Sequence, residues 1–131
     1  MDNLDRFIKA QNNLVGHTDT VYNRAIQELS NGYLKIHCWI RYLFPQLKGL
    51  GKSSVTKYFE LKNREEAKAY IEHPLLKERL IKAAEAVLNN EKNAYSIFGN
   101  DVIKFRSSML LFASVSDEPI FKQVLVKYGW N

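Results

Sequence analysis

The segment with the clearest chemical potential is a loop with two glycines and two hydroxyls, Gly49-Leu50-Gly51-Lys52-Ser53-Ser54. It precedes a short helix expected over residues 55–61, so flexible backbone N–H groups and a helix N-terminus lie together. That combination can hold a phosphate or a carboxylate, and Ser53 is the hydroxyl that would join it. The spacing differs from that of a Walker loop and no strand precedes it, so a turn with an N-capping serine is the alternative.

A second candidate is a pair of cations placed against a helix dipole. Lys104 and Arg106 fall in the first two turns of a helix expected after Asp101, where each opposes the macrodipole by about 0.3 to 1 kcal/mol. Ser107 and Ser108 add hydroxyl donors. The two cations lie about 200° apart around the helix, so they share a ligand only if their long side chains curl. In the alternative interpretation Arg106 pairs with a buried carboxylate and Lys104 is solvated.

Aromatic and basic side chains mix in a third segment. His37 and Arg41 are four residues apart and share a helical face, with Trp39 and Tyr42 close by. Such a mixture can stack a nucleobase and pair with its phosphate. Core packing is the alternative role for Trp39.

The histidines and the cysteine do not form a catalytic or metal-binding pattern. The three histidines and the single cysteine lack metal-ligand spacing. Cys38 and His37 are adjacent on a helix and diverge by about 100°, so they cannot act as a nucleophile and base. His73 precedes Pro74, a position that predicts a helix cap. We therefore expect no metal and no cofactor.

Composition limits the class of protein. The chain has 131 residues and a net charge of +5, with 19 basic and 14 acidic residues interspersed. The charge favours anionic partners mildly, and because the basic residues are dispersed among acidic ones it disfavours a nucleic-acid surface. A single cysteine excludes an intrachain disulfide, no stretch approaches the ~20 apolar residues of a membrane span, and the acidic N-terminus differs from a signal peptide. We expect a cytoplasmic protein that does not bind membranes.

Apolar residues recur at intervals of three and four residues rather than at intervals of two, which is typical of helices. The pattern and its caps predict an all-α, compact single-domain bundle of about eight short helices over residues 1–131. Expected caps are Asp2 or Asn3, Thr18 or Asp19, an Asn63–Glu66 capping box, Pro74 at the first helical position, Asp101 and Asp117. The expected helices span residues 4–14, 19–31, 34–44, 55–61, 64–72, 74–88, 94–98, 102–115 and 117–128.

Short fragments along nearly the whole chain resemble the family called domain of unknown function 1810. Their order and spacing carry the resemblance, which implies an all-helical fold and no established activity. The fragments are Phe44-Pro45-Gln46-Leu47, Gly49-Leu50-Gly51 with Ser53, Glu66-Ala67, Ala69-Tyr70, His73-Pro74, Arg79-Leu80, Ile97-Phe98-Gly99, Lys104, Arg106-Ser107-Ser108-Met109 and Leu111-Phe112.

The chain also departs from the family pattern. Cys38 stands where relatives carry a histidine, and Arg41 replaces a second aromatic residue. The family's C-terminal extension is absent beyond Gly129-Trp130-Asn131. We interpret the chain as a short, diverged member, whose lysine- and asparagine-rich composition suits an AT-rich genome such as that of a phage or mobile element.

These observations favour binding or sequestration of a phosphate-bearing small molecule, such as a nucleotide or an ADP-ribose-like metabolite. One alternative is an enzyme that hydrolyses such a nucleotide, for example a glycosidase, with Asp101 or Glu66 as general base. Another is a protein- or nucleic-acid-interaction module. The expected ligand-binding residues, gathered in a pocket between helices, are Trp39, Tyr42, Ser53, Lys104, Arg106, Ser107 and Ser108.

Overall fold

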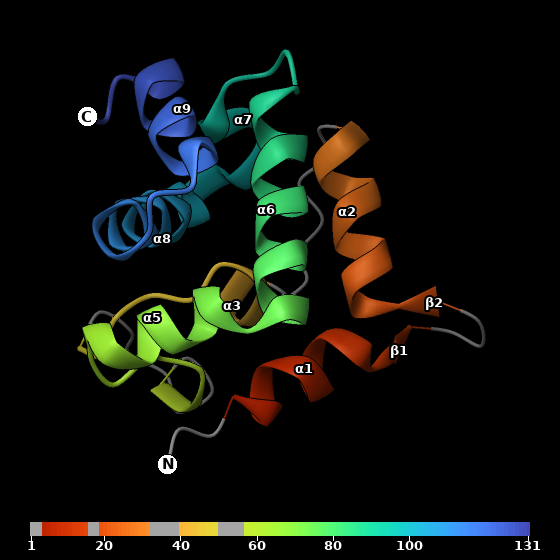
Figure 1. Cartoon of the computed structure of the whole chain (residues 1–131). Helices are drawn as coiled ribbons and strands as arrows, with labels where there is room; N and C mark the ends of the chain where they lie inside the picture. The colour runs from red at the N-terminus through yellow and green to blue at the C-terminus, as the bar shows by residue number, and fades with distance from the viewer. Residues whose placement is uncertain (1–3, 16–18, 32–39, 50–56) are drawn as a thin grey trace.

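The computed structural model describes residues 4–15, 19–31, 40–49 and 57–131 (Figure 1). Its elements, in chain order, are α1 (Asp5–Asn12), β1 (Leu14–Val15), β2 (Asp19–Thr20), α2 (Val21–Asn31), α3 (Ile40–Leu43), α5 (Arg64–Glu72), α6 (Pro74–Leu88), α7 (Ala94–Phe98), the 3₁₀ turn η1 (Gly99–Asp101), α8 (Val102–Val115) and α9 (Pro119–Tyr128). The chain is therefore all-α and compact, as expected. Among the described residues, six helices have eight residues or more, slightly fewer than the expected number of about eight, and two more helical segments have only four and five residues.

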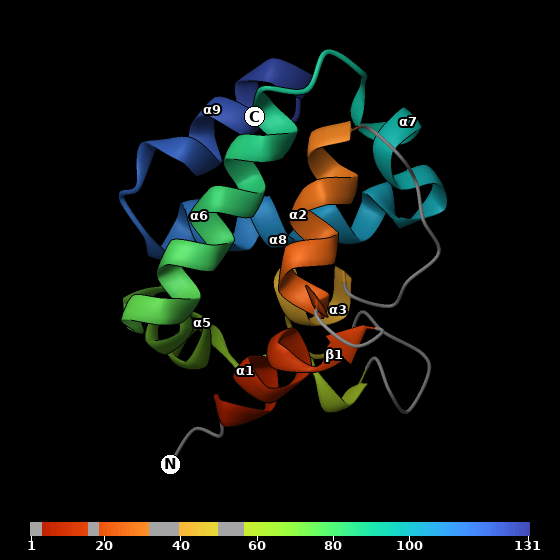
Figure 2. The ribbon, with the colours of Figure 1, turned by 90° about the vertical axis from the view of Figure 1, so that its right-hand side faces the viewer.

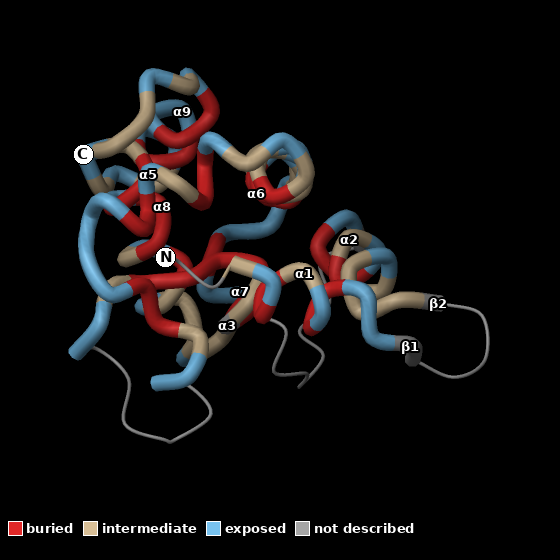
Figure 3. Tube along the Cα trace, turned by 60° about the horizontal axis from the view of Figure 1, so that its bottom comes forward, coloured by how far each residue is buried: buried red, intermediate tan, exposed pale blue. Residues whose placement is uncertain are grey.

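Helix α6 is the centre of the arrangement. It packs against α2, α5 and α9, while α8 packs against α5, α7 and α9. Figure 2 shows α2 and α6 side by side in front of α8. Helix α1 lies across one end of this bundle and packs on α2 and α3. Buried positions recur on the inward faces of the helices (Figure 3).

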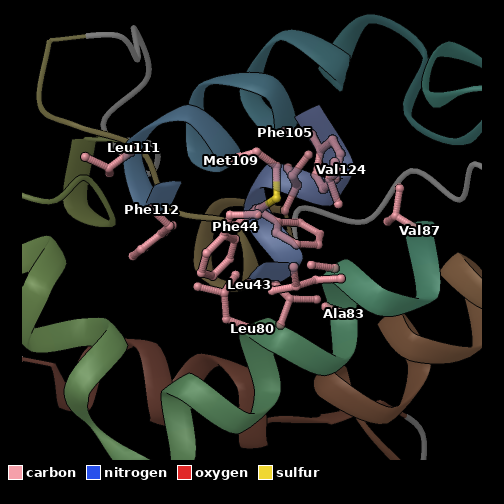
Figure 4. Close-up of a cluster of buried hydrophobic side chains, with 14 of the residues drawn as sticks. Leu43, Phe44, Leu80, Ala83, Val87, Phe105, Met109, Leu111, Phe112 and Val124 are labelled. Carbon is pink, nitrogen blue, oxygen red and sulfur yellow. The ribbon is translucent and has the colours of Figure 1, made fainter. Parts of the chain in front are cut away.

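The core between α6 and α8 is rich in phenylalanine. Phe105 on α8 lies 4.8 Å from Phe44 and 4.5 Å from Phe98 between ring centroids. Met109 and Leu80 are fully buried as well, and Figure 4 shows both with Phe44 and Phe105 in the space between the two helices. Burial of such side chains stabilises the fold by roughly 1.5 to 3 kcal/mol each.

Three helix boundaries follow the prediction. Asn63 accepts the N–H of Glu66 through Oδ1 at 2.9 Å, and Pro74 occupies the first turn of α6. Gly129 has a φ of 72° and ends α9 in a Schellman motif, in which Trp130 N–H donates to the Leu125 carbonyl at 2.8 Å. These predictions are confirmed.

Other boundaries differ from the prediction. At the start of α2, Thr20 Oγ1 accepts the Asn23 N–H at 3.1 Å, a cap that the prediction did not include. Asp101 makes no side-chain cap for α8, because it lies in the preceding 3₁₀ turn.

The first helix is shorter than predicted. It ends at Asn12 instead of continuing to residue 14, because the chain then forms the two-residue strand β1, which pairs with β2.

Part of the prediction falls where the structure gives no description. Asp2, Asn3, Thr18 and most of the helix expected over residues 34–44 lie outside the described residues. Of the helix expected over 55–61, residues 57–58 are helical and the chain then turns. Within the described part of the chain, no helix is long and apolar enough to cross a membrane.

Candidate functional site

The four residues predicted on α8 do not face one common space. The Nζ atom of Lys104 lies 3.4 Å from Asp101 Oδ1, and Arg106 is exposed. Ser107 is half-buried, whereas Ser108 is fully buried and its Oγ has no hydrogen-bond partner among the described residues. Successive helical residues diverge by about 100°, which explains this separation. The assignment of these residues to a ligand stays a prediction.

Tyr42 lies on α3, apart from this group. It is half-buried, and its ring contacts Phe59 edge to face at 4.8 Å. Its carbonyl accepts hydrogen bonds from Gln11 Nε2 at 2.8 Å and from Tyr70 Oη at 3.1 Å. Trp39 and Ser53 lie outside the described residues, as do His17, His37 and Cys38.

The chain on either side of the predicted glycine loop comes together in what we call the loop neck, residues 46–48 and 60–62. Lys48 N–H donates to the Leu61 carbonyl at 2.8 Å, and Leu61 N–H donates to the Gln46 carbonyl at 2.9 Å. Leu47 and Leu61 thus form an isolated parallel bridge. The pairing fixes where the loop leaves and rejoins the helical body.

A cavity of about 480 Å³ opens beside the loop neck, and we call it the neck cavity. Its described lining residues are Lys48, Gly49, Lys57, Glu60 and Lys62. The three lysines are exposed, whereas Glu60 is buried and its Oε1 accepts the Gly49 N–H at 3.4 Å. Three lysines and one glutamate give these residues a formal charge of +2. The volume lies within the range of small-molecule sites.

An arginine near the N-terminus, Arg6, holds the loop neck through hydrogen bonds. Arg6 on α1 is only 9% exposed. Its Nε donates to the Tyr58 carbonyl at 2.9 Å, and its Nη2 donates to the Glu60 carbonyl at 3.0 Å and to Glu66 Oε1 at 3.1 Å. The same Glu66 oxygen accepts the Lys62 N–H at 2.9 Å. We call Arg6 and Glu66 the neck clamp.

The Glu66 carboxylate therefore takes a role that the capping-box prediction did not include. In a capping box it would bind the N–H of Asn63, but it binds the N–H of Lys62 instead. Glu66 is fully buried and does not line the neck cavity.

A second polar group docks α1 beyond the clamp. Gln11 Nε2 donates to Tyr70 Oη at 3.2 Å, and Arg79 on α6 donates to Gln11 Oε1 at 3.2 Å and to Asn12 Oδ1 at 2.8 Å. Burial raises the pKa of Tyr70 well above its ordinary value, although the hydrogen bond from Gln11 and the charge of Arg79 act against the shift. His73 is the C-cap of α5, as predicted, and its Nδ1 also accepts the Leu76 N–H at 3.5 Å at the start of α6.

A larger hollow, which we call the α5 groove, has a volume of about 770 Å³ and lies between α5 and the α8–α9 connection. Its floor includes Ile71, Ala113 and Val115. Three basic and three acidic residues line it, so their formal charges cancel: Arg64, Lys68 and Lys77 with Glu65, Glu72 and Asp117.

Sequence reasoning missed the neck clamp and Glu60. The partners of Arg6 lie 52 to 60 residues away, and no local pattern marks such a contact. The lysines around the loop were visible as a diluted basic cluster, and the loop itself as a candidate anion site. No group of three histidine, cysteine, aspartate or glutamate residues suited to a metal occurs among the residues that the structure describes.

Comparison with known proteins places these features in a family. Among curated proteins, none matches the chain. The crystal structure of the conserved hypothetical protein Rv1873 from Mycobacterium tuberculosis, at 1.38 Å, is similar, with 36% sequence identity and a TM-score of 0.87. The match covers 98% of this chain and 89% of that one. The family described as "Protein of unknown function (DUF1810)" matches residues 1–130. The chain therefore belongs to this family, as the fragments in its sequence indicated.

Proposed function

We propose that the protein binds a phosphate-bearing small molecule, such as a nucleotide or an ADP-ribose-like metabolite, in the neck cavity. The observation that carries the proposal is the convergence of three lysines on one cavity beside a fixed loop neck. Lysine ammonium groups are common phosphate ligands. A phosphate placed among three of them gains Coulomb energy that solvent at the cavity mouth screens only in part.

The backbone at Gly49 suits such a role. Its φ of 101° is a conformation that L side chains rarely adopt, and it turns the chain at the cavity edge. Glu60 accepts the Gly49 N–H and thereby fixes this turn. The turn therefore lies directly after Lys48, one of the lysines that line the cavity.

The other candidate locations offer less. The α5 groove has no net charge in its lining, so a phosphate gains nothing there from the summed field. On α8, Arg106 is exposed and Ser108 is buried, so no shared concave surface supports them as one site.

The test compares two variants with equal charge change. Lys48, Lys57 and Lys62 are replaced by Gln in the neck variant, and Arg64, Lys68 and Lys77 are replaced by Gln in the groove variant. Thermal melting is followed with and without pyrophosphate, ADP and ADP-ribose.

In wild type we expect the ligand to raise the free energy of unfolding by about 2.7 kcal/mol at a ligand concentration one hundred times Kd. The groove variant should keep this gain and the neck variant should lose it. Equal loss in both variants would mean that only the total charge matters, and the proposal would be wrong.

A second candidate function, hydrolysis of such a ligand, is favoured by one observation: the carboxylate of Glu60 lines the neck cavity. As a general base it would take a proton from the attacking water. Phosphorus-31 NMR of ADP and ADP-ribose incubated with the protein would reveal products, and Glu60→Gln should abolish them. Intact ligands in the presence of wild type would leave binding without turnover as the function.

A further inference from the structure

The segment from Lys57 to Lys62 supplies three of the five described residues that line the neck cavity. Little regular structure supports it. Residues 57–58 are helical, the chain then turns, and Leu61 pairs in the isolated bridge. The main-chain bonds of this stretch include Glu60 N–H to the Lys57 carbonyl at 3.3 Å and Leu61 N–H to the Gln46 carbonyl at 2.9 Å. Contacts from elsewhere in the chain must help to fix its lysines.

Arg6 supplies such contacts. Its guanidinium binds the carbonyls of Tyr58 and Glu60, which bracket the middle of the segment. A guanidinium is a rigid planar fork, so two carbonyls bound to it are held at a set separation and angle. A lysine ammonium keeps the charge but not this geometry. Arg6 therefore determines the backbone path between Lys57 and Lys62.

Glu66 extends the same control to Lys62. Its Oε1 accepts both from Arg6 Nη2 at 3.1 Å and from the Lys62 N–H at 2.9 Å. Because Glu66 is fully buried on α5, it provides a rigid support for this cavity lysine. Neither Arg6 nor Glu66 lines the cavity, so neither would touch a ligand there.

We propose that the neck clamp positions the neck cavity for its anion, an inference that rests on the proposed function. Arg6 and Glu66 are positioning residues: they set ligand affinity through the backbone that carries Lys57 and Lys62. Because coupling between two sites is reciprocal, an anion in the cavity must in turn stabilise the docking of α1. The proposal thus links the N-terminal helix to ligand binding.

The structure offers a matched control in Arg79. Arg79 also docks α1, through Gln11 Oε1 and Asn12 Oδ1, but it makes no contact with the loop neck among the described residues. Arg6→Lys and Arg79→Lys each replace one α1-docking guanidinium, and only the first alters the neck. Glu66→Gln is a second clamp variant that keeps the side-chain shape.

Pyrophosphate is the probe, and its Kd is measured by titration calorimetry at a temperature at which circular dichroism shows each variant folded. We expect Arg6→Lys and Glu66→Gln to raise Kd about tenfold, the effect of one lost charged hydrogen bond, and Arg79→Lys to leave it near the wild-type value. Hydrogen exchange supplies the second readout. Pyrophosphate should slow exchange of the α1 amides in wild type and in Arg79→Lys, but not in Arg6→Lys.

The outcomes separate the two proposals. If wild type does not bind pyrophosphate, ADP or ADP-ribose, the proposed function fails and the clamp inference fails with it. If wild type binds and the clamp variants bind equally well, only the clamp inference is overturned. It is also overturned if the Arg6 and Arg79 variants weaken binding equally, because general loosening of α1 would then be the cause.

Discussion

The neck cavity and the α5 groove differ in charge and in what lies beneath them. Both are lined by three basic residues, but the groove has three acidic residues among them and the neck cavity has one. The groove lining includes apolar residues such as Ile71. The neck is instead hydrogen-bonded to the buried ion pair of Arg6 and Glu66. A cluster of surface lysines is usually a solvated face. Here the buried polar support distinguishes the neck cavity from the α5 groove, and it supports the proposal of a site at the neck.

The largest expected effect is a difference in stability between a variant of the neck clamp and a variant of the α5 groove. Arg6→Met should lower the free energy of unfolding by about 3 to 5 kcal/mol, because the carboxylate of Glu66 is left buried without its cation. Lys77→Met at the groove breaks an exposed pair with Glu118 and should change it by about 1 kcal/mol or less. Urea denaturation measures both. Similar small losses in the two variants would show that the clamp has no special weight.

The second largest effect is expected at alkaline pH, where ionisation of the buried Tyr70 should lower the free energy of unfolding. Burial raises the pKa of Tyr70 above that of the unfolded chain, near 10. The stability this group contributes is complete below about pH 10 and falls by up to about 1.4 kcal/mol per pH unit as pH rises toward the folded pKa. Burial also raises the pKa values of Tyr22 and Tyr128, which act in the same direction.

The midpoint of urea denaturation, measured from pH 8 to pH 11, tests this prediction. This range includes the ordinary tyrosine pKa of about 10. Tyr70→Phe cannot ionise at this position, so its midpoint should fall less steeply than that of wild type. Parallel curves for the two proteins would contradict a dominant role for Tyr70.

Two glycines provide a smaller and cleaner comparison. Gly49 and Gly129 both have positive φ, and a Cβ at either position would meet no atom within 4 Å. Alanine should therefore destabilise each by about 1 kcal/mol through backbone strain alone. Only Gly49→Ala should also weaken pyrophosphate binding, as followed by calorimetry. Weaker binding in Gly129→Ala would show that pyrophosphate affinity depends on the stability of the whole protein rather than on the geometry of the loop neck.

The smallest effect is expected at Arg106. It is exposed and has no carboxylate within 4.0 Å among the described residues, so Arg106→Ala should change stability by about 0.5 kcal/mol or less. Thermal melting with and without ADP should give the same ligand gain as wild type. If ADP no longer stabilises Arg106→Ala against thermal unfolding, the ligand binds at α8 rather than at the neck.

Local sequence signals predicted the helices well. Pro74, Asn63 and Gly129 act through contacts within a few residues, so their caps were visible in the sequence. Asp101 failed as a cap because the chain forms a 3₁₀ turn before α8.

The candidate site was predictable only in part. The glycine loop was recognised as a place for an anion, but the contacts of Arg6 join residues that lie 52 to 60 positions apart in the sequence. The predicted set on α8 relied on sequence proximity, and helical geometry separates Arg106 from Ser108. Distant contacts such as those of the neck clamp arise only from the assembled fold.

The most direct test of the anion site is to map a bound anion by amide NMR. Pyrophosphate is titrated into ¹⁵N-labelled protein, and the shifts of assigned backbone amides are followed. We expect the largest shifts at Lys48, Gly49 and Lys62, with smaller shifts in α1 and none in the α5 groove. Shifts confined to the groove or to α8, with the loop neck unchanged, would contradict an anion site at the neck.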